Sequence, residues 1–286
     1  MIPTVLMTAI GIILLAIGGA QSVTLVGGIL VLSFCAMALT GYTIGTIFVT
    51  RGASLAAVQN EFLSSVSHEL RTPLTSMRMF IDTLREGRVE DPNEQQRCLA
   101  IIDQELVRLD GLVAKLIELS KIEHHEAAFD RRVVSVSDVV TDALAAFEAV
   151  KVGGDVEVVV KLEPDLAVWG DRATLAQAVS NLLSNAWKYT PERGKKIDVV
   201  TTTDGKRVFI TVADNGQGVQ RQEQNAIFEK FHRGSAAQSH SGMGSGLGLA
   251  IVRAAVEAHR GKIDVKSDAG RGARFRITLP RCLVAT

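Results

Sequence analysis

The first fifty residues are mostly apolar and contain no Asp, Glu, Lys, Arg or His. A helix of that length would measure about 75 Å, whereas the hydrocarbon core of a bilayer is about 30 Å thick and needs about 20 residues. The pattern in residues 1–50 therefore predicts two transmembrane helices, residues 3–17 and 23–49, joined at residues 18–22. Arg51 would then mark the cytoplasmic edge of the second helix.

Two alternatives for this segment stay open. A signal peptide cleaved after Ala20 is compatible with the small residues Gly18 and Ala20, although the start of the chain lacks basic side chains. In that case residues 23–49 still cross the bilayer, and everything after Arg51 lies inside. The other alternative is a buried hairpin in a soluble protein.

Beyond this segment, apolar side chains recur at spacings of three and four, which indicates a helix with one apolar face. They are Leu55, Val58, Phe62, Val66, Leu70, Leu74, Met77, Ile81 and Leu84. Residues 86–88 end this helix, and Asp91 and Pro92 predict the N-cap and first residue of another. The second helix carries Leu99, Ile102, Leu106, Leu109, Val113, Leu116, Leu119 and Ile122. Residues 51–126 are therefore predicted to form an antiparallel hairpin, packed with a second copy or on its own chain.

Residues 130–286 contain five segments that are rich in Val, Ile, Thr and Phe and bounded by Gly, Asp or Pro, which predicts strands. These segments are residues 156–161, 197–203, 208–213, 263–267 and 273–279. Asp204 and Gly205 predict a tight hairpin between two of them. Helices are predicted at residues 136–149, 172–188 and 248–259. The fold class is thus multi-domain, with a C-terminal α+β domain of helices layered on one sheet.

Charge and cysteine content narrow the function classes. Lys plus Arg and Asp plus Glu number 31 each, so the formal net charge is zero and the sequence predicts no nucleic-acid partner. The three cysteines, Cys35, Cys98 and Cys282, have no spacing typical of a metal site or a disulfide framework. Reduced, structural cysteines are therefore expected.

His68 and Thr72 lie four residues apart, on one face of the first hairpin helix. A neutral imidazole can attack phosphorus near pH 7, and Glu69 beside it can accept the ring proton and fix the tautomer. The Thr72 hydroxyl can orient a water for the reverse, dephosphorylating reaction. Pro73 is expected to bend the helix, because it removes the hydrogen bond to the carbonyl of Glu69. His68 lies off the apolar stripe and is expected to face solvent.

A second group of polar residues lies on the helix that follows Asp171, the predicted N-cap. Asn181, Asn185 and Lys188 lie on one side of this helix, at offsets of four and three. Two amide oxygens can bind a hard cation that keeps several waters and bridges phosphates, which suits Mg²⁺. The Lys188 ammonium can meet a phosphate oxygen.

Three later segments have features of a nucleotide site. The Asp214 carboxylate follows a strand and can accept the exocyclic amine of adenine, while Gly216 and Gly218 allow a ligand to approach closely. Phe228 and Phe231 are suited to anchoring a lid, and Arg233 is suited to phosphate. Residues 242–249 read Gly-Met-Gly-Ser-Gly-Leu-Gly-Leu and open a helix whose free N–H groups can hold phosphates.

Taken in order, these segments resemble the H box, N box and glycine boxes of bacterial membrane-bound sensor histidine kinases of two-component systems, over residues 58–280. The resemblance implies a homodimeric phosphotransfer domain, a four-helix bundle in the dimer, followed by a gyrase- and heat-shock-chaperone-like ATP-binding domain. It also implies that His68 is the phosphoacceptor, Glu69 the acid/base and Thr72 the phosphatase residue. Asn185, with Asn181, would hold Mg²⁺.

The ATP-binding residues implied by the same resemblance are Asn181, Asn185, Lys188, Tyr189, Asp214, Gly216, Gly218, Phe228, Phe231, Arg233, Gly244, Gly246, Leu247 and Gly248. Related gyrase-type ATPases carry a water-activating Glu at the position of Asn181. Its replacement by Asn favours phosphoryl transfer to an acceptor over simple ATP hydrolysis.

The sequence thus predicts a sensor histidine kinase that autophosphorylates His68 with ATP and Mg²⁺, passes the phosphoryl group to an aspartate of a response regulator and also dephosphorylates that regulator. The regulator is expected to be a separate protein, because no receiver domain follows Leu279. The expected location is the inner (cytoplasmic) membrane, with the catalytic part in the cytoplasm. The stimulus is expected at the bilayer, directly or through a membrane partner protein, because residues 18–22 are too few to form a ligand pocket.

Two rival functions remain. A phosphatase-dominant or pseudokinase membrane scaffold would bind the regulator without net autophosphorylation, and its signature would be an eroded nucleotide box, which is not seen. A gyrase-like ATPase clamp is disfavoured by Asn181 and by the segment around His68.

Overall fold

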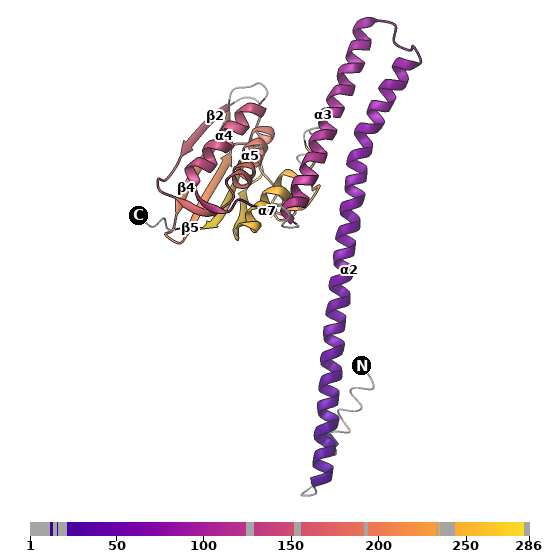
Figure 1. The fold of residues 1–286 in the computed structure, drawn as a ribbon, viewed down its shortest axis with the longest axis vertical. Helices are drawn as coiled ribbons and strands as arrows, with labels where there is room; N and C mark the ends of the chain where they lie inside the picture. The colour runs from indigo at the N-terminus through magenta and orange to yellow at the C-terminus, as the bar shows by residue number, and fades with distance from the viewer. Residues whose placement is uncertain are drawn as a thin grey trace. The chain divides into compact units, whose positions relative to one another are not determined.

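The computed structural model describes residues 12, 13, 16, 22–123, 129–151, 156–191, 194–232, 234 and 244–282. The chain divides into two compact units, Met1–Val66 and Ser67–Thr286 (Figure 1). Helix α2 (Ser22–Arg85) contributes residues to both units and continues through Arg51 and Gly52 without a break.

The described part of the first unit consists mainly of α2. Its window Val31–Phe48 is long and apolar enough to cross a bilayer, by length and composition. Within this window the hydroxyls of Thr40, Thr43 and Thr46 donate to backbone carbonyls three or four residues earlier, at 2.8–2.9 Å, so the helix itself satisfies them. The predicted first span, residues 3–17, lies almost wholly outside the described residues. Among the described residues, the prediction of two transmembrane helices therefore rests on one helix.

The second unit begins with the hairpin of α2 and α3 (Pro92–Glu123), whose ends lie where the sequence places them. Helix α2 ends at Arg85, and Gly87 adopts the left-handed conformation, with φ of 63°, that an ordinary side chain disfavours. Asp91 caps α3, since its Oδ1 accepts the Asn93 N–H at 2.9 Å. Both predicted helices and the break between them are therefore confirmed.

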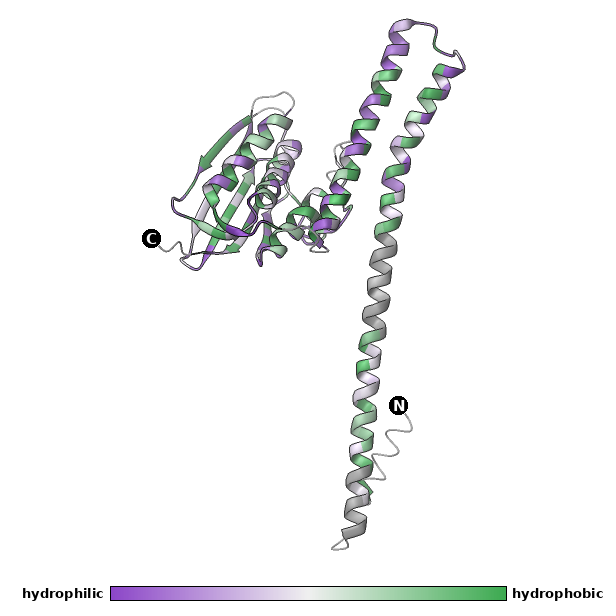
Figure 2. Ribbon diagram, in the orientation of Figure 1, coloured by the Kyte–Doolittle hydropathy of each residue, from purple (hydrophilic) through white to green (hydrophobic). Residues whose placement is uncertain are grey.

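Apolar side chains on both helices of this hairpin remain exposed in the single chain, where they alternate with polar positions (Figure 2). They are Leu74, Met79, Ile81, Leu99, Leu106, Val107, Val113 and Ile117. Exposed apolar residues over two adjacent helices are typical of a surface that another protein covers. Dimerisation through this hairpin stays a prediction.

A five-stranded sheet forms the centre of the C-terminal domain. Its strands are β2 (Val156–Lys161), β4 (Lys195–Thr203), β5 (Arg207–Asp214), β6 (Lys262–Ser267) and β7 (Ala273–Pro280), in the order β2-β4-β5-β7-β6. Only the β2–β4 pair is parallel within this sheet. All five predicted strands are confirmed, as is the hairpin at Asp204 and Gly205, where the Asp204 N–H donates to the Arg207 carbonyl.

Helices α4 (Val136–Val150), α5 (Arg172–Tyr189) and α7 (Gly248–Ala258) pack on one face of this sheet and enclose the core (Figure 1). Alternate residues of the strands, among them Ile197, Val199 and Ile210, point into that core and are at most 1% exposed. The predicted α+β layering is confirmed. The sequence did not predict β1 (Arg132–Ser135) and β3 (Ala167–Gly170), which pair with each other in a separate two-stranded sheet.

The last turns of α3 join the same core. Leu112, Leu119 and Ile122 are buried against the C-terminal domain, at spacings that place them on one face of the helix. At the end of α3, the Glu123 carboxylate accepts a hydrogen bond from Lys230 Nζ at 2.8 Å. Helix α3 therefore contributes side chains to the surroundings of the nucleotide-type motifs.

Candidate functional site

The predicted phosphoacceptor His68 is exposed on α2, as its position off the apolar stripe indicated. The Thr72 hydroxyl is also exposed and donates to the His68 backbone carbonyl at 3.2 Å. Pro73 lies inside the helix, so the carbonyl of Glu69 loses its usual backbone donor. The His68 imidazole thus lies on an exposed helical face that another domain or protein can reach.

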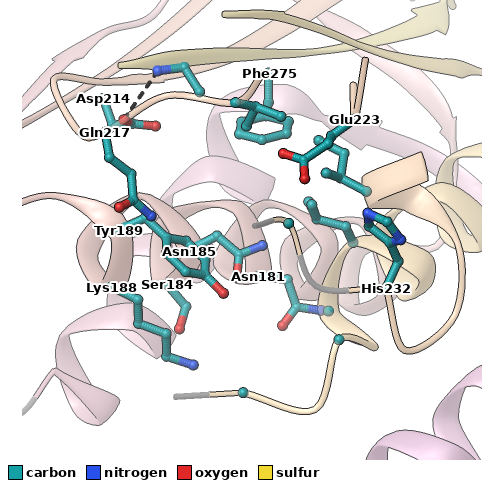
Figure 3. Close-up of a pocket in the computed structure, with 18 of the residues that line it drawn as sticks. Asn181, Ser184, Asn185, Lys188, Tyr189, Asp214, Gln217, Glu223, His232 and Phe275 are labelled. Atoms are coloured by element: carbon teal, nitrogen blue, oxygen red, sulfur yellow. Dashed lines mark hydrogen bonds between the residues drawn. The ribbon is translucent and has the colours of Figure 1, made fainter. Parts of the chain in front are cut away.

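The nucleotide-type motifs surround one cavity of about 130 Å³ (Figure 3). Its lining comprises Lys115 of α3; Asn181, Ser184, Asn185, Lys188 and Tyr189 of α5; Asp214, Gln217, Gly218, Val219, Glu223, Ile227, His232 and Gly234 after β5; Gly244, Ser245, Gly246, Gly248 and Leu249; and Ala273 and Phe275 of β7. Segments far apart in the sequence thus contribute polar groups to one cavity.

Asp214 is fixed by the backbone around it. Its Oδ1 accepts the N–H of Gly216 at 2.8 Å and the N–H of Ala273 at 3.2 Å, which leaves Oδ2 for a ligand in the cavity (Figure 3). Burial raises the pKa of the Asp214 carboxyl above its ordinary value, and the two N–H donors oppose that rise. A ligand that donates a hydrogen bond to Oδ2 would help to compensate the burial of this carboxylate.

Helix α5 presents the two predicted amides and Lys188. Asp171 caps the helix, since its Oδ1 accepts the Thr174 N–H at 2.8 Å, and this sets the helical register from which Asn181, Asn185 and Lys188 face the cavity (Figure 3). Among the described residues, Nδ2 of Asn181 is buried and has no hydrogen-bond partner. Because a buried polar atom without a partner is costly, this atom indicates that a ligand belongs beside it.

Two further buried polar atoms in the lining also lack partners within the described part of the chain, namely His232 Nε2 and Ser245 Oγ. Together with Asn181 they supply donors and acceptors around the same space. A ligand rich in oxygen atoms, such as a polyphosphate, matches this set.

Lys188 lies in a positively charged part of the cavity. Burial lowers the pKa of its ammonium, and the neighbouring charge of Lys115 lowers it further. A polyanion bound between these two side chains would relieve both effects.

The glycine loop is shaped by close backbone contacts. Gly246 has φ of 69°, and a Cβ at this position would lie 2.7–2.9 Å from backbone atoms of Phe231. The Phe231 N–H donates to the Gly246 carbonyl at 3.1 Å and ties the two segments together. Helix α7 then begins at Gly248, which lines the cavity, so the first N–H groups of that helix start at its wall.

The structure brings most of the predicted nucleotide residues to the cavity, but not all of them. Gly216 lies behind the lining, where it donates to Asp214. Phe228 is buried and packs edge-on against Phe275, which does line the cavity. Phe231 and the fully buried Leu247 also lie outside the lining. Arg233 lies outside the described residues.

Several lining residues were not singled out from the sequence. Gln217 lies between two predicted glycines, and its place in that motif was the available signal. Phe275 is an inward-facing residue of β7, and nothing in the strand pattern separates it from other core positions. Lys115 reaches the cavity from a different predicted domain, and the sequence carries no local signal for such a contact.

A second pocket, of about 190 Å³, adjoins the first. Glu69 and Pro73 of α2 line it together with Lys115, Gly244 and Ser245, and the last three also line the first cavity. The residue next to His68 and the glycine loop of the same chain therefore share one pocket.

Comparison with known proteins agrees with this arrangement. The family model of the His Kinase A (phospho-acceptor) domain matches residues 58–125. The model of the Histidine kinase-, DNA gyrase B-, and HSP90-like ATPase matches residues 170–282. The two matches cover the hairpin that bears His68 and most of the domain that forms the cavity.

Individual relatives extend the comparison. The sensor-like histidine kinase SenX3 of Mycobacterium tuberculosis is 35% identical over 233 residues, which is 82% of this chain and 56% of SenX3. Sensor histidine kinase WalK of Bacillus subtilis is 35% identical over 236 residues, or 81% of this chain and 38% of WalK. This chain thus spans about half the length, or less, of these relatives. The structure of histidine kinase ThkA in complex with the response regulator protein TrrA matches with a TM-score of 0.63 and 25% identity, over 78% of this chain and 61% of that one.

Proposed function

Because this chain belongs to the sensor histidine kinases of two-component systems, we propose that it uses ATP to phosphorylate its own His68 and then passes the phosphoryl group to an aspartate of a separate response regulator. One observation carries the proposal: a cavity with adenine-type and phosphate-type groups adjoins a pocket lined by Glu69, the neighbour of an exposed histidine. The ThkA–TrrA complex supports a receiver protein as the partner.

The proposed roles follow from the chemistry of each group. Asp214 Oδ2 accepts the exocyclic amine of adenine, and Lys188 and the start of α7 hold the phosphates. Nε2 of His68 attacks the γ-phosphorus; the new N–P bond forms as the P–O bond to the β-phosphate breaks, and ADP leaves with that electron pair. Glu69 takes the Nδ1 proton of the ring. The products are phosphohistidine and ADP.

Mg²⁺ fits this site through amide oxygens. We assign Asn185 and Asn181 to hold it, because rotation of the amide can present either Oδ1 or Nδ2, and the unpartnered amide of Asn181 needs a ligand. Among the described residues, no cluster of three or more His, Cys, Asp or Glu side chains offers another site. When bound, Mg²⁺ would neutralise the negative charge of the phosphates.

The same helical face supports a phosphatase activity toward the phosphorylated regulator. Thr72 is exposed one turn from His68, and its hydroxyl can exchange its bond to the His68 carbonyl for a water. A phosphatase-dominant or pseudokinase scaffold remains the alternative function. It differs from the proposed kinase in forming no phosphohistidine.

We further propose a membrane-anchored homodimer. The apolar window Val31–Phe48 supports the anchor, and the apolar side chains left exposed on the hairpin support a second copy as their cover in a four-helix bundle. The catalytic part would then lie in the cytoplasm, after Arg51.

The decisive experiment incubates the full chain, in detergent micelles, with γ-labelled ATP and Mg²⁺. We expect an acid-labile, base-stable label that is absent from His68→Gln and present in the control Thr75→Ala, which alters an exposed residue of the same helix. A label of equal strength in His68→Gln would refute the assignment. Absence of label from the wild-type chain, with ATP binding intact, would favour the scaffold.

A further inference from the structure

Lys115 is the one lining residue of the nucleotide-type cavity, among the described residues, that α3 supplies. Its position is determined by packing, because Leu112 and Leu119, on the same face of α3, are 6% and 2% exposed against the C-terminal domain. The Lys115 ammonium is thus held beside the cavity by its helix, although it belongs to the domain that bears His68.

Lys115 has both cationic and carboxylate neighbours: Lys188, Asp214 and Glu223 line the same cavity, and Glu69 lines the adjoining pocket. Lys115 faces Lys188, whose pKa is lowered by burial and then by the charge of Lys115. The ion pairs found within the described part of the chain include neither Lys115 nor Lys188. Glu118, one turn along α3, interacts with Lys115; burial raises the pKa of Glu118, and the charge of Lys115 lowers it. In Figure 3 the Lys188 side chain extends away from Asp214 and Glu223.

Two ammonium groups in one cavity repel each other unless an anion lies between them. The cavity also holds the start of α7 and the unpartnered Ser245 hydroxyl, which are suited to phosphate oxygens. The chemical class that satisfies all of these groups is a polyphosphate.

We propose that Lys115 is a phosphate-binding residue of the ATP site, contributed by the phosphotransfer hairpin, so that the site is complete only when α3 is packed on the C-terminal domain. This inference rests on the proposed kinase function and deepens it. Lys115 also lines the pocket of Glu69 and Ser245, so the cation that binds the phosphates borders the acceptor segment as well. The docked hairpin thereby recognises ATP through its charge and orients the terminal phosphate toward its own helix.

The test compares nucleotide affinities of the full chain in a His68→Gln background, where no turnover occurs. The variants are Lys115→Gln, Lys115→Arg and, as a matched control, Lys121→Gln, which alters an exposed lysine of the same helix. The probes are ATP with Mg²⁺, ADP with Mg²⁺ and adenosine. We expect Lys115→Gln to weaken ATP binding by about tenfold to a hundredfold, in line with the loss of a charged hydrogen bond, and to leave adenosine binding unchanged.

The expected affinity loss is smaller for ADP than for ATP, Lys115→Arg restores ATP binding, and Lys121→Gln matches the parent chain. ATP affinity that is unchanged in Lys115→Gln would overturn the proposal. An equal loss for ATP and adenosine would also overturn it, since that result assigns Lys115 to packing alone. Failure of the parent chain to bind ATP at all would instead refute the proposed function.

Discussion

Asp214 combines a fixed position with a carboxylate that is costly to bury. Two backbone N–H groups hold its Oδ1, and burial raises its pKa; within the described part of the chain, its Oδ2 accepts no hydrogen bond. An adenine amine would supply a donor to Oδ2. Such a carboxylate would select nucleotides by their base and not by their number of phosphates.

Replacement of Asp214 by Asn is therefore expected to weaken ATP, ADP and adenosine to the same extent. An unpaired buried amine costs about 1–3 kcal/mol, which corresponds to a loss of about fivefold to a hundredfold in affinity. Calorimetry of each ligand with the full chain measures this, and Asp110→Asn, at an exposed position of α3, is the control. A variant that binds ATP as tightly as the wild type would remove Asp214 from the site. The uniform loss also separates Asp214 from Lys115, whose loss should depend on the phosphates.

Single residues could be predicted from the sequence where a local motif surrounds them. Asp214, Asn185 and Lys188 lie in such motifs, and all three line the cavity. Lys115 has no motif, because its role depends on contacts between α3 and segments more than sixty residues away in the sequence. Leu247 shows the opposite case: it lies within the glycine motif, yet its apolar side chain is buried in the core.

Strands and helices were predictable where they are long and their apolar period is regular. The four-residue strands β1 and β3 were not predicted, because four residues are too few to show a clear alternation of apolar and polar side chains. Each strand also lies just before a segment with a strong helical pattern. The residue that follows β3 nevertheless matters, since the Asp171 N–H at the start of α5 donates to His259 at the end of α7. His259, just after α7, makes that contact.

At this contact between α5 and α7, the buried His259 imidazole forms hydrogen bonds with two backbone groups. His259 Nε2 accepts the Asp171 N–H at 2.9 Å, and its Nδ1 lies 2.7 Å from the Ala255 carbonyl, which identifies the neutral tautomer protonated at Nδ1. Burial lowers the pKa of His259; the charge of Arg131 acts in the same direction, and the charge of Asp171 opposes it. Protonation would remove the acceptor that holds the N-cap of α5.

Acid should therefore weaken this contact at a pH where the protein is otherwise intact. The unfolded chain binds a proton at His259 more readily than the native state, so this contribution to stability is complete above a pH of about 6.5 and declines below it, by at most about 1.4 kcal/mol per pH unit. Hydrogen exchange at the Asp171 amide, corrected for its intrinsic pH dependence, should accelerate between about pH 6.5 and 5. The control is the exposed His68→Gln variant, which should behave as the wild type. An exchange rate without that acceleration would contradict the role of His259.

At the scale of the whole molecule, the chain joins one apolar helix window to two family domains, at residues 58–125 and 170–282. The order of these parts could be read from the sequence. The sequence did not indicate whether the nucleotide site of one chain would phosphorylate His68 of the same chain or of a second copy. That choice depends on how the domains pack. The shared pocket of Glu69 and Ser245 favours transfer within one chain.

A mixture of two inactive chains tests this. Dimers that combine His68→Gln with Asn185→Asp should carry no phosphohistidine, because neither chain has both an acceptor and a complete nucleotide site. Wild-type dimers carry the label under the same conditions. Two differently tagged chains, co-purified and incubated with γ-labelled ATP, provide the measurement. Label on the Asn185→Asp chain of the mixed dimer would show that transfer runs between chains.

The pocket shared by Glu69 and Ser245 also has a genetic consequence. If acceptor and donor belong to one chain, a cell that makes both a normal copy and a copy lacking His68 and Asn185 keeps a working unit in every mixed dimer. Such an allele is expected to reduce signalling only in proportion to gene dosage. If the phosphoryl group instead passed from one chain to the other, every mixed dimer would be inactive. The same allele would then be dominant negative.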